Sequence, residues 1–242
     1  MLFRSSRVRA QTFTTLHSFT ATSGSGYPTN NDGARPYGGV ILSDNTLYGT
    51  GYEGGSSGYG TLFKVNTDGT GFTNLHTFAG YPSDGANPYA GLILSGHTLY
   101  GTARNGGTSG SGTVFAVNTD GTGFTTLYRF TATVVDPSSG YPTNSDGAHP
   151  QAGLILTNNT LYGTAERGGS SGNGTVFSLS LPLPQLTIIR SGLNVILTWP
   201  TNAAGYTLQS APIIAGTFTN ISGTNPYTNA ITSTPQFFRL SH

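Results

Sequence analysis

Cysteine is absent from this chain of 242 residues, methionine and tryptophan occur once each, and only 8% of the residues are charged. Without cysteine there can be no disulfide bond, iron–sulfur cluster or thiolate zinc site, although secretion is not excluded. The formal net charge of +1 gives no reason to expect nucleic acid or an acidic membrane surface as a partner. No apolar run approaches the roughly 18 residues of a membrane-spanning helix, so no transmembrane segment is predicted.

Glycine and aromatic residues are abundant. The chain has 36 glycines, 13 phenylalanines and 13 tyrosines. A helical protein would need runs of alanine, leucine, glutamate and lysine, and a disordered chain would lack so many large rings to bury. The composition therefore favours an all-β protein.

The first eleven residues are basic. Arg4, Arg7 and Arg9 precede Ala10, and residues 8–10 resemble a signal-peptidase site, but the apolar stretch of a secretory signal is missing. Residues 1–11 are interpreted either as the remnant of a signal peptide or as a short disordered leader.

Two motifs each occur three times. In both motifs the second copy lies 52 residues after the first, and the third copy lies 62 residues after the second. LYGT begins at residues 47, 99 and 161, and GT-(L/V)-F begins at residues 60, 112 and 174. Whole units are therefore repeated, and we expect a three-unit β-repeat domain over residues 12–180.

Each unit contains four short runs rich in β-branched and aromatic residues and bounded by turn residues, the pattern of strands. In the first unit the four runs are FTTLHSF, GVILS, TLYGT and GTLFKV. We call FTTLHSF and its equivalents FTNLHTF and FTTLYRF the first-type runs. Two-residue turns join the second and third runs, and NTDGTG joins the fourth run to the first-type run of the next unit. The predicted sheet order is second, third, fourth, then the following first-type run.

The third unit has no downstream first-type run, whereas residues 13–19 have no upstream unit. We therefore expect residues 13–19 to pair with residues 174–179 and close the domain, as in β-propellers. The predicted fold is all-β, with three four-stranded propeller-like blades. A threefold trefoil or prism is the alternative. If three units do not close alone, a second molecule could complete an open arc.

Composition changes after the repeats. Residues 181–184 read LPLP and predict a stiff linker, and residues 185–242 contain about five short strands that suit a small β-sandwich with Trp199 in its core.

The motifs DGA-x-P, LYGT, GG-x-(S/T)-G-x-G-T-(V/L)-F and NTDGTGF, repeated over residues 12–179, resemble the GloVer tandem repeats of bacterial surface and secreted proteins. The segment with ILTWP, GYTLQSA and QFFRLS resembles a small β domain found at the end of such proteins. The resemblance implies a secreted or cell-surface location in a bacterium. The sequence departs from the pattern by ending at His242 without an apolar anchor, and the resemblance brings no established activity.

Three acids recur in Asp-Gly-Ala-x-Pro, namely Asp32, Asp84 and Asp146. A recurring aspartate of this kind suits a carboxylate that caps backbone N–H groups before a strand. A ring of three such acids is a less favoured calcium site, because calcium takes about six to eight oxygens. No metal or cofactor is predicted.

The positions that differ between the copies are the candidate ligand-binding residues, because they lie on loops, where scaffolds carry recognition. After DGA and after LYGT these are Arg35, Asn87, His149, Tyr52, Glu53, Arg104, Asn105, Glu166 and Arg167. Surface variation without function is the alternative interpretation.

No catalytic residue is assigned, since no nucleophile motif or metal-binding histidine spacing occurs. The sequence favours a non-enzymatic binding or display scaffold whose partner is a glycan or a surface protein. The rival hypothesis is a polysaccharide-active enzyme that combines acids from separate units, for example Glu53 and Glu166.

Overall fold

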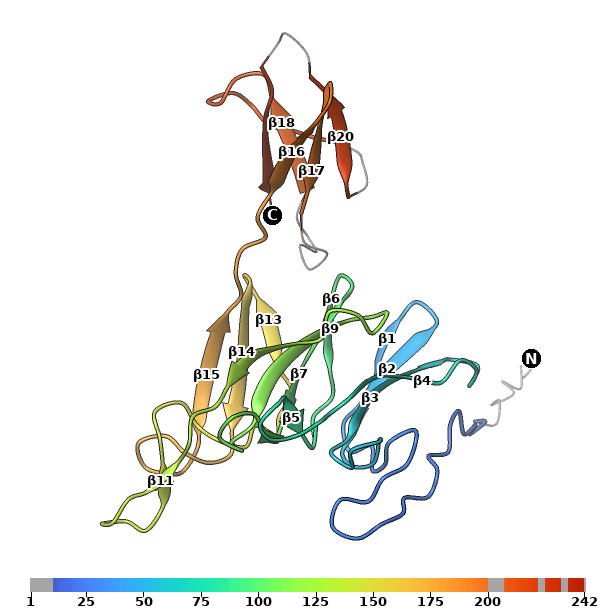
Figure 1. Cartoon of the computed structure of the whole chain (residues 1–242), viewed down its shortest axis with the longest axis vertical. Helices are drawn as coiled ribbons and strands as arrows, with labels where there is room; N and C mark the ends of the chain where they lie inside the picture. Colours follow the sequence, from blue (N-terminus) through green and yellow to red (C-terminus); the bar gives the residue numbers. More distant parts are fainter. Residues whose placement is uncertain (1–10, 200–206, 222–224, 232–234, 242) are drawn as a thin grey trace, which may run out of the picture.

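The computed structural model describes residues 11–199, 207–221, 225–231 and 235–241 (Figure 1). The predicted leader therefore lies outside the described residues except for Gln11. Over the described ranges the chain is all β, its paired strands are antiparallel, and none of its sheets closes on itself. The same ranges contain no helix long and apolar enough to cross a membrane.

The first two units form the predicted four-stranded sheets. The first sheet has the order β1-β2-β3-β4 and the second β6-β7-β9-β10. Their strands are β1 (Ile41–Ser43), β2 (Thr46–Gly51), β3 (Thr61–Asn66), β4 (Thr73–Thr77), β6 (Ile93–Ser95), β7 (Thr98–Ala103), β9 (Thr113–Asn118) and β10 (Thr125–Arg129). This order confirms that the first-type run of the next unit completes each of these two sheets.

The third unit has three strands instead of four. β13 (Ile155–Thr157), β14 (Thr160–Ala165) and β15 (Thr175–Ser180) form one sheet, and β15 is its free edge. Residues 13–19 form no strand, so the predicted pairing with residues 174–179 is wrong. In Figure 1 residues 13–19 lie at the opposite end of the array from β15, because their rings pack on the first unit. His17 stacks on Phe72 with ring centroids 3.6 Å apart.

Local turn residues explain the hairpins that join the second and third runs of each unit. Asp44, Gly96 and Asn158 each start a two-residue turn with a positive φ. Such turns match the twist of the strands, and they need residues that tolerate this backbone region. The Asp-Gly hairpin also forms, but its turn is wider than two residues: Asn66 N donates to Thr70 O over 2.9 Å.

Two apolar cores lie between neighbouring sheets. The first combines Tyr48 and Leu62 of the first sheet with Leu99 and Phe115 of the second. The second repeats this arrangement between the second and third sheets, for example with Tyr100 and Leu161. Each unit therefore buries one face against the preceding unit and offers the other to the next.

A proline and a glycine fix the contact between units. A Cβ atom on Gly112 would lie only 2.6 Å from Cδ of Pro150, and its φ of +102° also disfavours other residues. One unit earlier, a Cβ atom on Gly60 would lie 2.7 Å from Cδ of Pro88. The constant glycines of GT-(L/V)-F thus allow neighbouring units to approach closely.

Two short pairs complete this part of the chain. β5 (Gly85–Ala86) pairs with β8 (Asn105–Gly106), and β11 (Val134–Val135) pairs with β12 (Pro142–Thr143) inside the insertion of the third unit.

The C-terminal segment forms two three-stranded sheets. One has the order β16-β17-β20 and the other β19-β18-β21. The strands are β16 (Thr187–Ser191), β17 (Asn194–Thr198), β18 (Thr207–Ala211), β19 (Thr219–Asn220), β20 (Tyr227–Ala230) and β21 (Phe237–Ser241). Leu197, with 0% exposure, is more deeply buried than Trp199, which was predicted as the core residue and is half-buried. An extended segment links these sheets to β15 (Figure 1).

Candidate binding surface

The two sets of variable positions meet in every unit, because backbone hydrogen bonds hold their loops side by side. Ala34 N donates to Glu53 O over 2.7 Å, and Tyr52 N donates to Arg35 O over 3.1 Å. The second unit pairs Ala86 with Asn105 in the same way, and the third pairs Ala148 with Arg167. Main-chain atoms make these bonds, so the arrangement does not depend on which side chain occupies a variable position.

The first variable position has a left-handed backbone in all three units. Arg35, Asn87 and His149 have φ values of 53°, 57° and 57°. Residues other than glycine rarely adopt this region, and a β-carbon there costs about 1 kcal/mol or more. Three different residues accept this conformation at equivalent positions, which marks the loop as a fixed feature of the repeat.

A chain of polar contacts crosses from unit to unit through these residues. Asn87 Nδ2 donates to Tyr52 O over 3.0 Å, and Asn105 Nδ2 donates to Asn87 Oδ1 over 3.0 Å. His149 Nδ1 lies 3.1 Å from Arg104 O and 3.0 Å from Asn105 Oδ1. Both of its neighbours are acceptors, so the Nδ1 nitrogen carries the proton. The variable residues therefore form one connected surface across the three units.

Burial lowers the pKa of His149, and the nearby cations Arg104 and Arg167 lower it further, whereas the hydrogen bond to Arg104 O and the charge of Glu166 oppose this. The net pKa lies below the ordinary 6.5. His149 is therefore neutral at pH 7, in agreement with its role as a hydrogen-bonding link.

Two ion pairs lie on the same surface. Arg35 Nη1 is 3.0 Å from Glu53 Oε1, and Arg104 Nη2 is 3.6 Å from Glu166 Oε2. Gln151 Nε2 also donates to Glu166. Each glutamate is thus paired with its own arginine.

Three tyrosines extend the surface at the end formed by the first and second units. The rings of Tyr37, Tyr52 and Tyr89 lie with centroids 5.1–5.9 Å apart. Tyr37 is 53% exposed and Tyr89 is 37% exposed. Sequence reasoning missed Tyr37, Tyr89 and Gln151, which share one repeat position. The available signal was that this position, just after the constant proline, also varies between the copies.

We call the complete set the variable surface. It consists of Arg35, Tyr37, Tyr52, Glu53, Asn87, Tyr89, Arg104, Asn105, His149, Gln151, Glu166 and Arg167.

The recurrent aspartates serve the scaffold. Asp84 Oδ1 accepts bonds from Ala79 N and Gly80 N over 2.8 and 3.0 Å, and Asp32 accepts a bond from Thr20 N over 2.9 Å. The predicted capping of backbone N–H groups is therefore confirmed, although the capped groups lie upstream, at the end of the preceding run. Among the described residues no three His, Cys, Asp or Glu side chains are placed to hold a metal ion.

Each aspartate also binds a ring from the preceding run, which sequence reasoning missed. His17 Nε2 lies 3.1 Å from Asp32, and His76 Nε2 lies 2.7 Å from Asp84. In the third unit the partner is the hydroxyl of Tyr128, which donates to Asp146 over 2.7 Å. The sequence contained a signal for this contact: the same repeat position, upstream of the constant aspartate, holds histidine or tyrosine in every copy, and both rings can form hydrogen bonds.

Ionisation at the third of these sites is shifted. Burial acts to raise the pKa of Asp146, but hydrogen bonds from Thr131 and Tyr128 outweigh it and leave the pKa below the ordinary 3.8. The bond to Asp146, assisted by burial, raises the pKa of Tyr128 to about 12.

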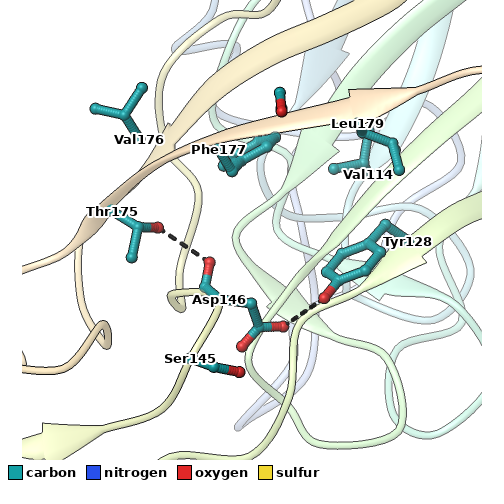
Figure 2. A pocket seen from close by; sticks show the side chains of 9 residues that line it. Val114, Tyr128, Ser145, Asp146, Thr175, Val176, Phe177 and Leu179 are labelled. Carbon is teal, nitrogen blue, oxygen red and sulfur yellow. Dashed lines mark hydrogen bonds between the residues drawn. The ribbon is translucent and has the colours of Figure 1, made fainter.

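Beside this third site lies a pocket of about 200 Å³, which we call the edge pocket (Figure 2). Tyr128 and Phe177 flank it, and the bonds of Asp146 to Tyr128 and Thr175 lie at its side. Its lining is Val114, Tyr128, Ser145, Asp146, Thr175, Val176, Phe177, Ser178 and Leu179.

The sequence profile of the Gloeobacter/Verrucomicrobia repeat matches residues 2–231. The chain belongs to this repeat family. The match spans both the three units and most of the C-terminal segment, so the family assignment rests on nearly the whole sequence. No curated protein matches the chain.

Three solved structures that resemble this member of the repeat family are distant from it. A nidogen/laminin complex has 18% identity over 64% of this chain and 51% of the other, with a TM-score of 0.34. A Bacteroides ovatus protein described as xyloglucan PUL GH43B has 14% identity over 81% of this chain and 42% of the other, also with a TM-score of 0.34. TolB from Acinetobacter baumannii has 12% identity over 66% of this chain and 50% of the other, with a TM-score of 0.27. The chain spans about half the length of these structures, and likenesses this low carry no argument about function.

Proposed function

We propose that this repeat protein is a non-enzymatic binding module that recognises its ligand through the variable surface, outside the bacterial cell or on its surface. One observation carries the proposal: the varying positions after DGA and after LYGT lie side by side in every unit, and hydrogen bonds and an ion pair link them from unit to unit.

A glycan is the ligand class that the chemistry of this surface favours. Exposed tyrosine rings offer apolar faces on which sugar rings stack, and amide, guanidinium and carboxylate groups beside them bind hydroxyls. Tyr37 and Tyr89 supply the rings, and Asn105, Arg104 and Glu166 supply the polar groups. A surface protein is the second ligand class.

The finer architecture belongs to the same proposal. We interpret the three sheets as propeller-like blades, since consecutive antiparallel sheets stack face to face with one strand contributed across each unit boundary. The C-terminal sheets are interpreted as a small sandwich, because residues of both, Val195 and Phe238 among them, line one pocket.

A glycan array probed with the purified full chain tests the function. Binding is expected to at least one polysaccharide class, and the variant Tyr37→Ala/Tyr89→Ala should lose about tenfold or more of the affinity. Tyr81→Ala, which removes a ring that is 67% exposed and outside the variable surface, is the matched control. Equal loss in both variants would contradict the proposed site.

The enzyme hypothesis is distinguished by turnover. Incubating each bound glycan with the wild type and with Glu53→Gln should release no product from either. Release of product that Glu53→Gln abolishes would replace the binding function with hydrolysis.

A further inference from the structure

The third sheet lacks the fourth strand that the first two possess, and the edge pocket lies where that strand would start. In the second sheet Phe124, just before β10, stacks on His76 with centroids 3.5 Å apart and on Phe115 at 5.7 Å. In the first sheet Phe72 stacks in the same way on His17 and Phe63. The equivalent rings of the third site are Tyr128 and Phe177, which flank the edge pocket (Figure 2). The pocket therefore has the position of a missing phenylalanine.

The face beside this edge is apolar and uncovered. Val114 and Tyr100 of the second unit are 0% and 3% exposed, because the third unit covers them. Their equivalents Val176 and Tyr162 are 83% and 42% exposed. The strand β15 also carries no lysine, proline or bulge that would protect a free edge. This end of the array thus has both an unpaired edge and an uncovered apolar face.

The opposite end of the array carries the complementary element. Residues 13–19, FTTLHSF, have the same motif as the strands that complete the first two sheets, FTNLHTF and FTTLYRF. They pack their rings on the first unit, yet within the described part of the chain they make no backbone hydrogen bond to another segment. Phe13, the equivalent of Phe72 and Phe124, is 93% exposed. One end of the array therefore carries a strand motif, residues 13–19, that pairs with no sheet. The other end carries the third sheet, which lacks its fourth strand.

We infer that a second copy of this chain docks on β15 through its residues 13–19, with its Phe13 in the edge pocket between Tyr128 and Phe177, and that two copies close a ring of six units. The docking first unit covers Val176 and Tyr162 as the third unit covers Val114 and Tyr100. Both junctions are identical in such a twofold pair. Six units lie within the range of about four to eight blades that propellers use, whereas three do not.

The register of the junction follows from the two complete sheets. Lys64 pairs with Thr73 in the first sheet, and Ala116 pairs with Thr125 in the second. The equivalent pair at the junction is Ser178 with Thr14 of the other copy. Residues paired in this way have Cα atoms about 4.5–5.5 Å apart, which is within the range that a disulfide bridges. Because the chain contains no cysteine, an engineered pair at these positions reports on this contact alone.

Light scattering and oxidative cross-linking of the full chain test the inference. The wild type is expected to have twice the chain mass of 25.1 kDa, and Thr14→Cys/Ser178→Cys should cross-link into a covalent dimer. Thr14→Cys/Thr157→Cys is the matched control, because Thr157 lies on β13, at the other edge of the third sheet, and it should not cross-link. Val176→Asp should weaken association at least about 100-fold, whereas Val135→Asp, at a valine 61% exposed on β11, should leave it unchanged. A monomer at all concentrations, a disulfide within one chain, or a ladder of larger covalent species would each overturn the two-copy ring.

Discussion

The hexapeptide TLYGTA occurs as β7 in the second unit and as β14 in the third, and the two copies have different surroundings. All six residues of β7 are buried, whereas the residues of β14 alternate between buried and accessible. The neighbouring strands differ in the same way, since Val114 is 0% exposed and Val176 is 83% exposed. Identical sequence and identical strand pairing thus lead to different burial, and the neighbouring unit decides which occurs.

The difference shows that a single unit does not bury both faces of its own sheet. The second unit is covered by the first on one side and by the third on the other, while the third is covered on one side only. Stability in such arrays comes from interfaces between units as well as from the units themselves. Equivalent substitutions in the second and third units should therefore change the free energy of unfolding by different amounts. The measurements below are made at protein concentrations where the chain is monomeric.

The largest difference is expected for a charge at the equivalent valines. Val114→Asp places a carboxylate without a partner in the core between the second and third sheets, which should cost about 4 kcal/mol or more and unfold the repeat array. Val176→Asp places the same group in solvent and should change the free energy of unfolding by less than about 0.5 kcal/mol. Urea unfolding followed by circular dichroism measures both, and equal losses would contradict the comparison.

A smaller difference is expected for the equivalent phenylalanines. Phe115 is fully buried and contacts the rings of Phe78 and Phe124, so Phe115→Ala should cost about 3–5 kcal/mol. Phe177 is half-buried at the edge pocket, and Phe177→Ala should cost about 1–2 kcal/mol. Urea midpoints provide the measurement. A larger loss at Phe177 would mean that the third sheet is covered in solution even in the monomer.

Acid should destabilise the array through Asp32 and Asp146. The pKa values of Asp32 and Asp146 lie below 3.8 in the folded protein, so the unfolded chain binds protons more readily. Their contribution is complete above about pH 4–5 and is lost as the pH falls through the lowered pKa values. Asp146→Asn should cost about 2 kcal/mol at pH 7 and reduce this acid dependence. Unfolding measured from pH 7 to pH 2 tests it, and a variant with an unchanged pH profile would contradict the assignment.

The smallest effect is expected for the hydroxyl of Tyr128. Tyr128→Phe removes the bond to Asp146 and should cost about 1 kcal/mol. The pKa of Tyr128 is raised to about 12 from 10.0, so the contribution of this bond is complete below pH 10 and is lost as the pH rises through 12. Ultraviolet titration of phenolate should therefore show a late tyrosine that is missing in Tyr128→Phe, whereas burial keeps the pKa of Tyr100 raised in both proteins. Tyr128→His, which copies the first two units, should change stability by less than about 1 kcal/mol.

Local signals explain what the sequence allowed us to predict. The hairpins at Asp44, Gly96 and Asn158 and the order of the first two sheets depend on turn residues a few positions away from the strands they join. The variable binding candidates could be recognised because the repeat supplies an internal alignment. Contacts between distant residues were harder to predict: the tyrosine cluster around Tyr37 includes Tyr89 and depends on how the first two units stack.

The incorrect prediction, closure by residues 13–19, has the same cause. The motif FTTLHSF has strand-forming residues, but a strand needs an edge to pair with, and the edge of β15 lies at the far end of the array. In the C-terminal segment Leu197 is completely buried, whereas Trp199, the predicted core residue, is half-buried.

The left-handed residue that follows Asp-Gly-Ala has a consequence for how this protein can change over evolution. Main-chain bonds and the proline–glycine contacts hold that residue in place, so arginine, asparagine and histidine occupy it on the same backbone. A substitution there alters the chemistry of the surface without altering the spacing of the units. Specificity can therefore change one residue at a time while the distances between recognition positions stay constant, an arrangement suited to ligands that are themselves periodic.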